Sequence, residues 1–315
     1  MLRALRGAGI RVETHVVGRE RPIPTRARAA IIDTIASRAA SPHIARMRAA
    51  GVRVIALALM EEGAVALARR ADAVVALSRS LTRELVEAGV PRTRIAIVSP
   101  GRDGTRHAPR SLTRERGMAR DVRVLCVANW TPGKGIHTLL EAIDGVPNVT
   151  VDLVGDAPDA RYAAIVRKRA RRLGGRVREY GPLGPPALAR RYATASIFAL
   201  PSVREGYGIA YAEALAHGLP VVACDIPVVR EVTDGAAVLV PAGEVRPLAV
   251  ALRRLATDGR ARSALARRAR ERARSLPTWR QMEAQIVRVI RAELRRAATA
   301  GRVAGARRTR ADQPW

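Results

Sequence analysis

The sequence predicts an α/β protein with two lobes, each built on a parallel sheet that helices cover on both faces. First, the chain has 315 residues, of which 48% are apolar, and this is enough for two packed cores. Second, short apolar runs of strand length alternate with helical segments along the whole chain. Third, the stretch 101–120 is rich in Arg, Gly and Thr without a hydrophobic period, which predicts a linker between lobes at 1–110 and 111–277.

The second lobe has the pattern of a complete doubly wound sheet. Its predicted strands are the apolar runs 122–127, 149–154, 177–180, 196–200, 221–224 and 238–240. Its predicted helices are 136–143, 160–172, 186–193, 209–217 and 245–256. In such a sheet, ligands bind beyond the carboxyl ends of the strands. The residues at these ends include Asn129, Gly155, Pro201 and Asp225.

The first lobe has a less regular pattern. Its predicted strands are 12–17, 52–59, 73–77 and 95–98. Its predicted helices are 25–37, 42–50, 63–70 and 80–88. At the far end of the chain, the segment 298–315 is rich in Arg and unpatterned, which predicts a disordered basic tail.

The chain is strongly basic, with 56 Lys and Arg against 28 Asp and Glu and a formal net charge of +28. All but two of the basic residues are arginines, and they are spread over predicted helix faces without interleaved aromatics. Aromatic residues make up only 3% of the chain, so there is little surface on which bases could stack. A specific nucleic-acid partner is therefore disfavoured, and general attraction of anions is expected.

Several other classes are excluded by absent motifs. No apolar run reaches the length of a membrane span and no signal-peptide pattern opens the chain, so a cytoplasmic location is expected. Cys126 and Cys224 lie in strand-like runs and are expected to be buried free thiols. A P-loop and a G-x-S-x-G motif are both missing, which excludes P-loop and serine hydrolases. No DxD motif or His/Asp cluster predicts a metal, and no cofactor is expected.

The most informative segment is 202–220, SVREGYGIAYAEALAHGLP. A glycine-flanked turn, 206–208, opens directly into the helix 209–217, whose unpaired N–H groups and positive dipole end favour a phosphate. Glu213 can accept two hydrogen bonds from a ribose diol, and Glu205 can reach a second polyol. Together these features predict a site for a nucleotide sugar. The alternative is a helix whose N-terminal acids only complement its dipole.

A second loop of interest is Pro132-Gly133-Lys134-Gly135, which follows the first strand of the second lobe. Lys134 would place a compact ammonium ion at a helix N-terminus, where it can neutralise a departing diphosphate. Taken alone, the loop is more typical of an ordinary helix start.

Six blocks of sequence follow one another between about 71 and 294. They are ADAVVALSRSLTRELVEAGVPRTRIAIVSPG, VLCVANWTPGKGIHTLLEAI, VDLVGDAPD, YGPLGPPALARRYATASIFALPS, SxxEGYGxxxxEALAxGLPVVA and VLVPAGE. In this order they resemble the retaining family 4 glycosyltransferases, the "glycosyl transferases group 1" domain. The resemblance implies the GT-B fold of two Rossmann-like lobes, a nucleoside diphosphate sugar as donor and no metal. It also implies a crossover helix, 278–297, that returns to the first lobe.

The chain departs from the family pattern at three places. Lys134 matches the lysine of the family's R-x4-K pattern, but Asn129 stands at the arginine, so Arg204 is the candidate substitute. No histidine follows the strand corresponding to 54–60, where relatives carry one. The first strand and glycine-rich loop of the family have no counterpart, so we expect either a shortened first lobe or a start site assigned too late.

These observations predict a glycosyltransferase of the hexosyltransferase type that moves a sugar from a nucleoside diphosphate to an acceptor hydroxyl, with the retention of configuration that the resemblance implies. The candidate catalytic residues are Lys134 and Glu205. The candidate donor-binding residues are Asn129, Gly133, Lys134, Arg204, Glu205, Gly206, Tyr207, Gly208, Ile209 and Glu213. The acceptor would be an unidentified glycan or lipid-linked intermediate, with a peripheral contact at the anionic inner membrane face. A catalytically impaired nucleotide-sugar binder is the alternative, and a basic nucleic-acid-binding protein is a third hypothesis.

Overall fold

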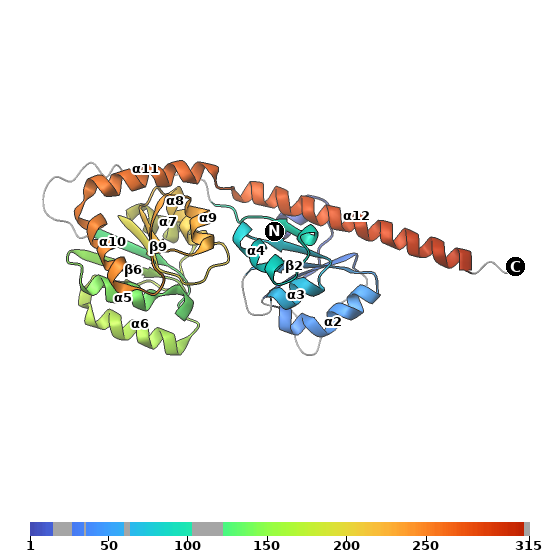
Figure 1. Ribbon diagram of the computed structural model, residues 1–315, viewed down its shortest axis with the longest axis horizontal. Coiled ribbons are helices and arrows are strands. Elements are labelled where there is room, and N and C mark those ends of the chain that lie inside the picture. Colours follow the sequence, from blue (N-terminus) through green and yellow to red (C-terminus); the bar gives the residue numbers. More distant parts are fainter. Residues whose placement is uncertain (15–26, 35, 60–63, 103–121, 312–315) are drawn as a thin grey trace. The chain divides into compact units, whose positions relative to one another are not determined.

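The computed structural model describes residues 1–14, 27–34, 36–59, 64–102 and 122–311 (Figure 1). The chain divides into two compact units. Unit 1 consists of Met1–Pro100 together with Trp279–Trp315, and unit 2 is Gly101–Thr278. The final helix is thus part of the first unit, whereas the expected lobe boundary at 110–111 lies outside the described residues.

Unit 2 contains a parallel six-stranded sheet with the order β10-β9-β8-β5-β6-β7. The strands are β5 (Val122–Val127), β6 (Val149–Val154), β7 (Val177–Glu179), β8 (Ile197–Leu200), β9 (Val221–Cys224) and β10 (Ala237–Val240). Each lies within one residue of its expected bounds. The chain winds outward from β5 through β6 and β7, then returns to β8 beside β5 and winds the other way. The carboxyl ends of β5 and β8 therefore flank the point where the strand order reverses, where open α/β sheets bind ligands.

The helices of unit 2 cover both faces of this sheet. Five were expected from the sequence: α5 (Ile136–Asp144), α6 (Ala160–Arg172), α7 (Pro185–Thr194), α8 (Ile209–Ala216) and α10 (Val245–Thr257). Two were missed, α9 (Pro227–Thr233) and α11 (Gly259–Ser275). The apolar face of α11 consists of one leucine and several alanines between arginines, so its helical period is weak in the sequence. Asp258 nevertheless caps it by accepting hydrogen bonds from the first backbone N–H groups.

Unit 1 contains a parallel four-stranded sheet with the order β1-β2-β3-β4. The strands are β1 (Ala29–Asp33), β2 (Arg53–Ala58), β3 (Ala73–Ala76) and β4 (Ile95–Ile97). The helices are α1 (Leu2–Gly7), α2 (Ser37–Ala49), α3 (Ala64–Arg70), α4 (Arg79–Glu87) and α12 (Trp279–Ala311). Alternate residues of β2 enter different cores: Val54 and Ala56 pack with α2, α3 and α4, while Ile55 packs with α1 and α12.

The expected helix at 25–37 is wrong, because this stretch contains the strand β1. The alanines and isoleucines of this stretch do not alternate with polar residues as in a half-buried strand. Alanine also has the highest helix propensity, so the sequence favoured a helix. Parallel pairing with β2 along the whole length of β1 decides the outcome, as residues 29–33 lie opposite 53–57. The expected strand at 12–17 is not formed in its described part, 12–14, and the rest of it lies outside the described residues.

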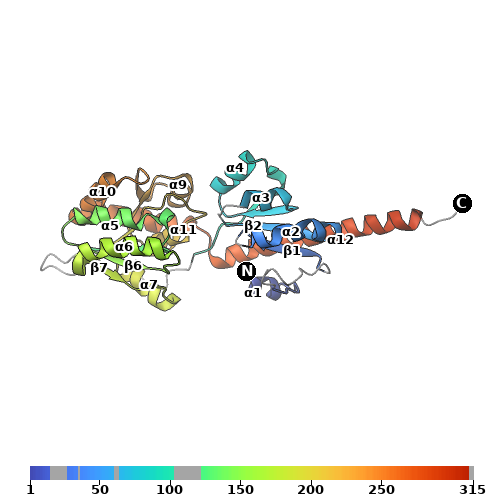
Figure 2. The ribbon, with the colours of Figure 1, turned by 90° about the horizontal axis from the view of Figure 1, so that it is seen from below.

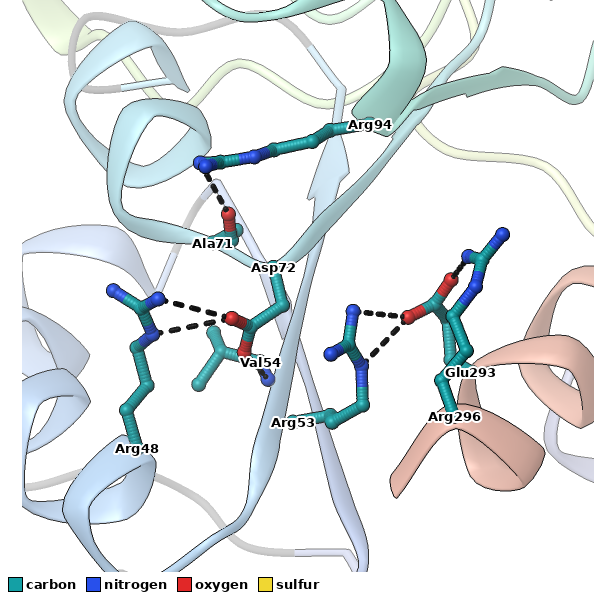
Figure 3. A network of polar contacts seen from close by, with 8 residues as sticks. All are labelled: Arg48, Arg53, Val54, Ala71, Asp72, Arg94, Glu293 and Arg296. Carbon is teal, nitrogen blue, oxygen red and sulfur yellow. Dashed lines mark hydrogen bonds and ion pairs between the residues drawn. The ribbon is translucent and has the colours of Figure 1, made fainter. Parts of the chain in front are cut away.

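The last helix, α12, lies beside α1, β1 and β2 (Figure 2). Ile286 and Ile290 bury their side chains against the sheet of unit 1. The carboxylate of Glu293, which is 3% exposed, accepts hydrogen bonds from Nε of Arg53 at 2.8 Å and pairs with its Nη2 at 2.7 Å. Arg296 approaches the second oxygen of the same carboxylate (Figure 3). The helical backbone continues to Ala311, past the expected end at 297 and into the segment expected to be disordered.

A second group of polar contacts in unit 1 lies around Asp72, the residue that precedes β3. Asp72 accepts the backbone N–H of Val54 at 2.8 Å and pairs with Arg48 of α2 at 3.1 Å (Figure 3). Arg94 donates to the carbonyl of Ala71. Both contacts lie at the end of the sheet where β2 and β3 begin, away from the carboxyl ends of these strands, which indicates a structural role.

Candidate functional site

Two loops meet beyond the carboxyl ends of β5 and β8. One is the short turn η2 (Pro132–Lys134) before α5, and the other joins β8 to α8. The backbone N–H of Val203 donates to the carbonyl of Gly133 at 2.9 Å. Gly135 has φ +64°, and a Cβ at this position would lie 2.3 Å from the carbonyl oxygen of Pro201. Only glycine fits this crossing, so the two loops are tied together.

The two candidate catalytic residues face each other across this crossing. Nζ of Lys134 lies 2.9 Å from Oε2 of Glu205, with side chains 24% and 8% exposed. The lysine comes from the β5 loop and the glutamate from the β8 loop, so the pair exists because the strand order reverses between them. The ammonium group keeps an exposed side, where it can attract a diphosphate while Glu205 holds it in place.

The N-terminus of α8 lies on the same rim. Gly208 has φ +88° at the N-cap, and a Cβ there would lie 2.5 Å from the ring of Tyr211, so glycine is again required. Ile209 begins the helix, and no side chain caps its N-terminus. The N–H of Tyr211 donates to the carbonyl of Gly208 at 3.0 Å, so the N–H groups of Ile209 and Ala210 are the ones suited to an anion. Gly206 and Tyr207 complete the turn. Burial raises the pKa of Tyr207 to about 12, with Arg272 opposing this shift, so its phenol stays neutral and anchors the turn.

The N-terminus of α5, in contrast, has an internal partner. The hydroxyl of Tyr162 accepts the backbone N–H of His137 at 3.3 Å and contacts the ring Nδ1 at 2.9 Å. A phosphate placed on this helix would have to displace the hydroxyl. The start of α8 is therefore the better anion site of the two.

Glu213 lies one turn into α8 and is half-buried. On the same helix, the carbonyl oxygen of Ala210 accepts a hydrogen bond at 3.3 Å from the hydroxyl of Tyr192, which comes from α7. Sequence reasoning missed this tyrosine. It precedes Ala210 by 18 residues and lies on another helix, so no spacing in the sequence relates the two.

Asn129 lies in the loop after β5, and Arg204 lies in the loop between β8 and α8. The side-chain oxygen of Asn129 accepts the backbone N–H of Asp156 at 3.4 Å, which ties the β5 loop to the loop after β6. The backbone N–H of Trp130 reinforces this tie by donating to the carbonyl of Asp156 at 2.7 Å. Arg204 is exposed, next to Glu205. Asn129 thus supplies a loop contact, while Arg204 supplies an exposed positive charge at the rim.

Both cysteines are free and buried, as expected. Burial raises the pKa of Cys126 to about 12 against the opposing effect of Lys134, so this thiol is no nucleophile at neutral pH. Within the described ranges, no three His, Cys, Asp or Glu side chains gather as a metal-binding group. None of the described helices is both long and apolar enough to cross a membrane.

Residues 121–258, most of unit 2, match the family model described as "Glycosyl transferases group 1". The D-inositol 3-phosphate glycosyltransferase of Thermomonospora curvata is 32% identical over 231 residues, which cover 65% of this chain and 54% of that protein. The GDP-mannose-dependent alpha-(1-6)-phosphatidylinositol monomannoside mannosyltransferase of Mycolicibacterium smegmatis is 33% identical over 171 residues, covering 49% and 44%. The chain thus spans about half the length of these curated relatives.

Solved structures resemble the chain over a larger share. Anabaena HepE in complex with UDP-glucose has a TM-score of 0.70 at 24% identity, covering 83% of this chain and 78% of that one. Sucrose-phosphate synthase from Thermosynechococcus elongatus has a TM-score of 0.69 at 21% identity, covering 84% and 73%. At these identities the likeness establishes the fold. Together with the two parallel sheets, it confirms the expected GT-B type.

Proposed function

Because residues 121–258 match the family model of the glycosyl transferases group 1, we propose that the whole chain is a glycosyltransferase of the hexosyltransferase type. It transfers a sugar from a nucleoside diphosphate to an acceptor hydroxyl, with retention of configuration and without a metal. The observation that carries the proposal is the ion pair between Lys134 and Glu205, held beside the N-terminus of α8 where the strand order reverses.

The proposed roles follow from where charge develops. Breaking the glycosidic bond leaves negative charge on the departing diphosphate, and groups that stabilise it there lower the barrier. Lys134 and the first N–H groups of α8 are suited to this role, and Arg204 can add a second cation. Glu205 orients the sugar through its hydroxyls, and Glu213 accepts the ribose diol.

The names of the relatives support the choice of donor and acceptor class. HepE was solved with UDP-glucose, and the M. smegmatis enzyme is named as dependent on GDP-mannose, so a nucleoside diphosphate sugar is the expected donor. The relatives are named for acceptors that are phosphorylated or lipid-linked inositols. We therefore infer a polyol acceptor, free or lipid-linked. The net charge of +28 would favour peripheral contact of a cytoplasmic protein with an anionic membrane face.

A second function, nucleotide-sugar binding without transfer, is favoured by one observation. Asn129 carries no charge where relatives are expected to carry an arginine, and its side chain is engaged with the loop after β6. Loss of one charged donor to a leaving group slows a reaction by about 100-fold or more. Measuring sugar release from UDP-glucose and GDP-mannose, with and without inositol phosphate, separates an enzyme from a binder.

The donor site is tested by calorimetric titration of UDP, GDP and their sugars. Lys134→Ala and Glu213→Ala should each weaken binding by about 100-fold, since each removes a charged partner of the ligand. Lys168→Ala is the matched control, because Lys168 is the only other lysine and lies exposed on α6. Its affinity should match that of the unaltered chain. Unchanged affinity in both site variants would contradict the proposed donor site.

A further inference from the structure

A column of four aromatic rings links the two ends of α8. The ring of His217, the C-cap of α8, is stacked on Tyr192 of α7 with centroids 5.1 Å apart. Tyr192 is in turn stacked on Phe198 of β8 with centroids 6.0 Å apart. Phe198 and Tyr211, in the first turn of α8, lie nearly perpendicular with centroids 5.7 Å apart. Phe198 is the single phenylalanine of a chain with only 3% aromatic residues, so the rings of this chain are concentrated beside the candidate site.

Tyr211, the last ring of the column, contacts both ends of the loop that joins β8 to α8. Its side chain is fully buried, and its hydroxyl donates to the carbonyl of Leu200, the last residue of β8, at 2.7 Å. Its backbone N–H donates to the carbonyl of Gly208 at 3.0 Å. A Cβ on Gly208 would lie 2.5 Å from the ring of Tyr211, so the turn packs closely on this ring. The loop between these two points, 201–207, carries Glu205.

The hydroxyl of Tyr211 stays a hydrogen-bond donor at neutral and moderately alkaline pH. Burial, and after it the negative charge of Glu205, raises the pKa of Tyr211 well above its usual value. Breaking a buried hydrogen bond is costly, because a polar group loses its partner without gaining water. The bond to Leu200 therefore holds the start of the loop, while the ring supports its end.

The position of the Glu205 carboxylate depends on this loop. The carboxylate is 8% exposed and lies 2.9 Å from Nζ of Lys134. On one side of Glu205, the backbone N–H of Val203 is bonded to the turn after β5. On the other side, Gly208 packs on the ring of Tyr211. Glu205 is thus held between two anchored points, and Tyr211 supplies the second of them.

We propose that Tyr211 is a positioning residue that sets the loop so that the Glu205 carboxylate meets the sugar of a bound donor. The inference rests on the proposed function, because it takes Glu205 as the group that orients the sugar. Tyr211 is fully buried, so it acts through the loop and does not contact the donor itself.

The test is Tyr211→Phe, which retains the ring and removes the hydroxyl. Calorimetry gives the ratio of the affinity for UDP-glucose to that for UDP, and the same ratio for GDP-mannose and GDP. This ratio isolates the contribution of the sugar. It should fall about 3- to 10-fold, the range expected for the loss of one hydrogen bond. A general loss of stability would weaken the binding of both ligands equally and leave the ratio unchanged.

Thr233→Val is the matched control. Thr233 is also fully buried in unit 2, and its hydroxyl donates at 2.7 Å to the backbone carbonyl of Val229. The variant therefore loses a buried hydrogen bond of the same length inside a different helix, α9. Its affinity ratio should equal that of the unaltered chain. An equal fall of the ratio in both variants would overturn the positioning role.

A double-mutant cycle with Glu205→Gln links the effect to the loop. In that background Tyr211→Phe should change the ratio less than about twofold, because the sugar contact that it would disturb is already lost. An unchanged ratio in Tyr211→Phe alone, or full additivity in the cycle, would overturn the positioning role while the proposed function stands. Absence of any nucleotide binding by the unaltered chain would instead overturn the proposed function.

Discussion

Two ion pairs of nearly the same geometry serve different purposes in the two units. In unit 1, Arg53 and Glu293 approach to 2.7 Å, and the carboxylate is 3% exposed. In unit 2, Lys134 and Glu205 approach to 2.9 Å, and the carboxylate is 8% exposed. The first joins a strand to a helix packed on it, whereas the second joins two loops at the carboxyl ends of strands.

The two ion pairs differ in their cation, which is an arginine in unit 1 and a lysine in unit 2. The arginine fork donates through two nitrogens to one carboxylate, which a further arginine also approaches, so Glu293 has its acceptors satisfied by protein. A lysine ammonium is a point charge with three rotatable donors. Lys134 can therefore hold Glu205 and still donate to a ligand. A close, buried ion pair thus indicates a binding site only when its cation retains donors for something else.

The largest expected effect concerns the pair in unit 1. Glu293→Gln would leave the Arg53 charge without a counter-ion under α12, lowering the free energy of unfolding of unit 1 by about 3 kcal/mol. Scanning calorimetry should show the transition of unit 1 shifted to lower temperature. Nucleotide affinity measured below that transition should change less than twofold. A fall in affinity with unchanged stability would reverse the roles assigned to the two pairs.

The matching change in unit 2, Glu205→Gln, should lower ligand affinity more than stability. In Glu205→Gln the flexible Lys134 side chain can turn its ammonium group to water, which the Arg53 fork under α12 cannot do, so stability should fall less than in Glu293→Gln. Affinity for a nucleoside diphosphate sugar should fall about tenfold, because the charged acceptor of the sugar hydroxyls is lost. Affinity for the free diphosphate should stay equal or rise, since Lys134 is released. Equal losses for both ligands would show that Glu205 does not contact the sugar.

Much of unit 2 could be predicted because its strands are buried on both faces and therefore read as uninterrupted apolar runs, as in 221–224. The strand β1 could not be predicted, because only its pairing with β2 distinguishes this alanine-rich run from a helix. Helix α11 could not be predicted either, because the arginines around its narrow apolar face weaken the hydrophobic period of the sequence. The loop motifs predicted both Lys134 and Glu205, yet their direct pairing follows from the order of the strands.

Tyr192 marks the limit of prediction within the site. Its sequence neighbours indicate only a helix before a buried strand. What places it against α8 is the stacking of its ring on His217 and the hydrogen bond from its hydroxyl to the carbonyl of Ala210. Contacts that form between helices through side-chain stacking leave no spacing that a single sequence could reveal.

The smallest expected effect is an alkaline loss of stability in unit 2. Tyr207 and Cys126 would ionise near pH 10 and 9 when unfolded, while burial raises the pKa of each to about 12 in the folded unit. Their contribution is therefore complete below about pH 9 and is lost as pH rises toward 12. Melting temperatures from pH 8 to 11 should decline, and less steeply in Tyr207→Phe. An equally steep decline in that variant would assign the effect to other groups.

The crossing of the two loops at Gly135 has a consequence for engineering. Since the turn after β5 and the turn after β8 touch through backbone atoms, a change of length in either one displaces the other. If only one of the two loops were replaced by that of a relative with a different donor, the new loop would not fit the remaining original loop at the crossing. Exchange of donor preference between such proteins should therefore succeed only when both segments are moved as one cassette, together with the glycine that lets them cross.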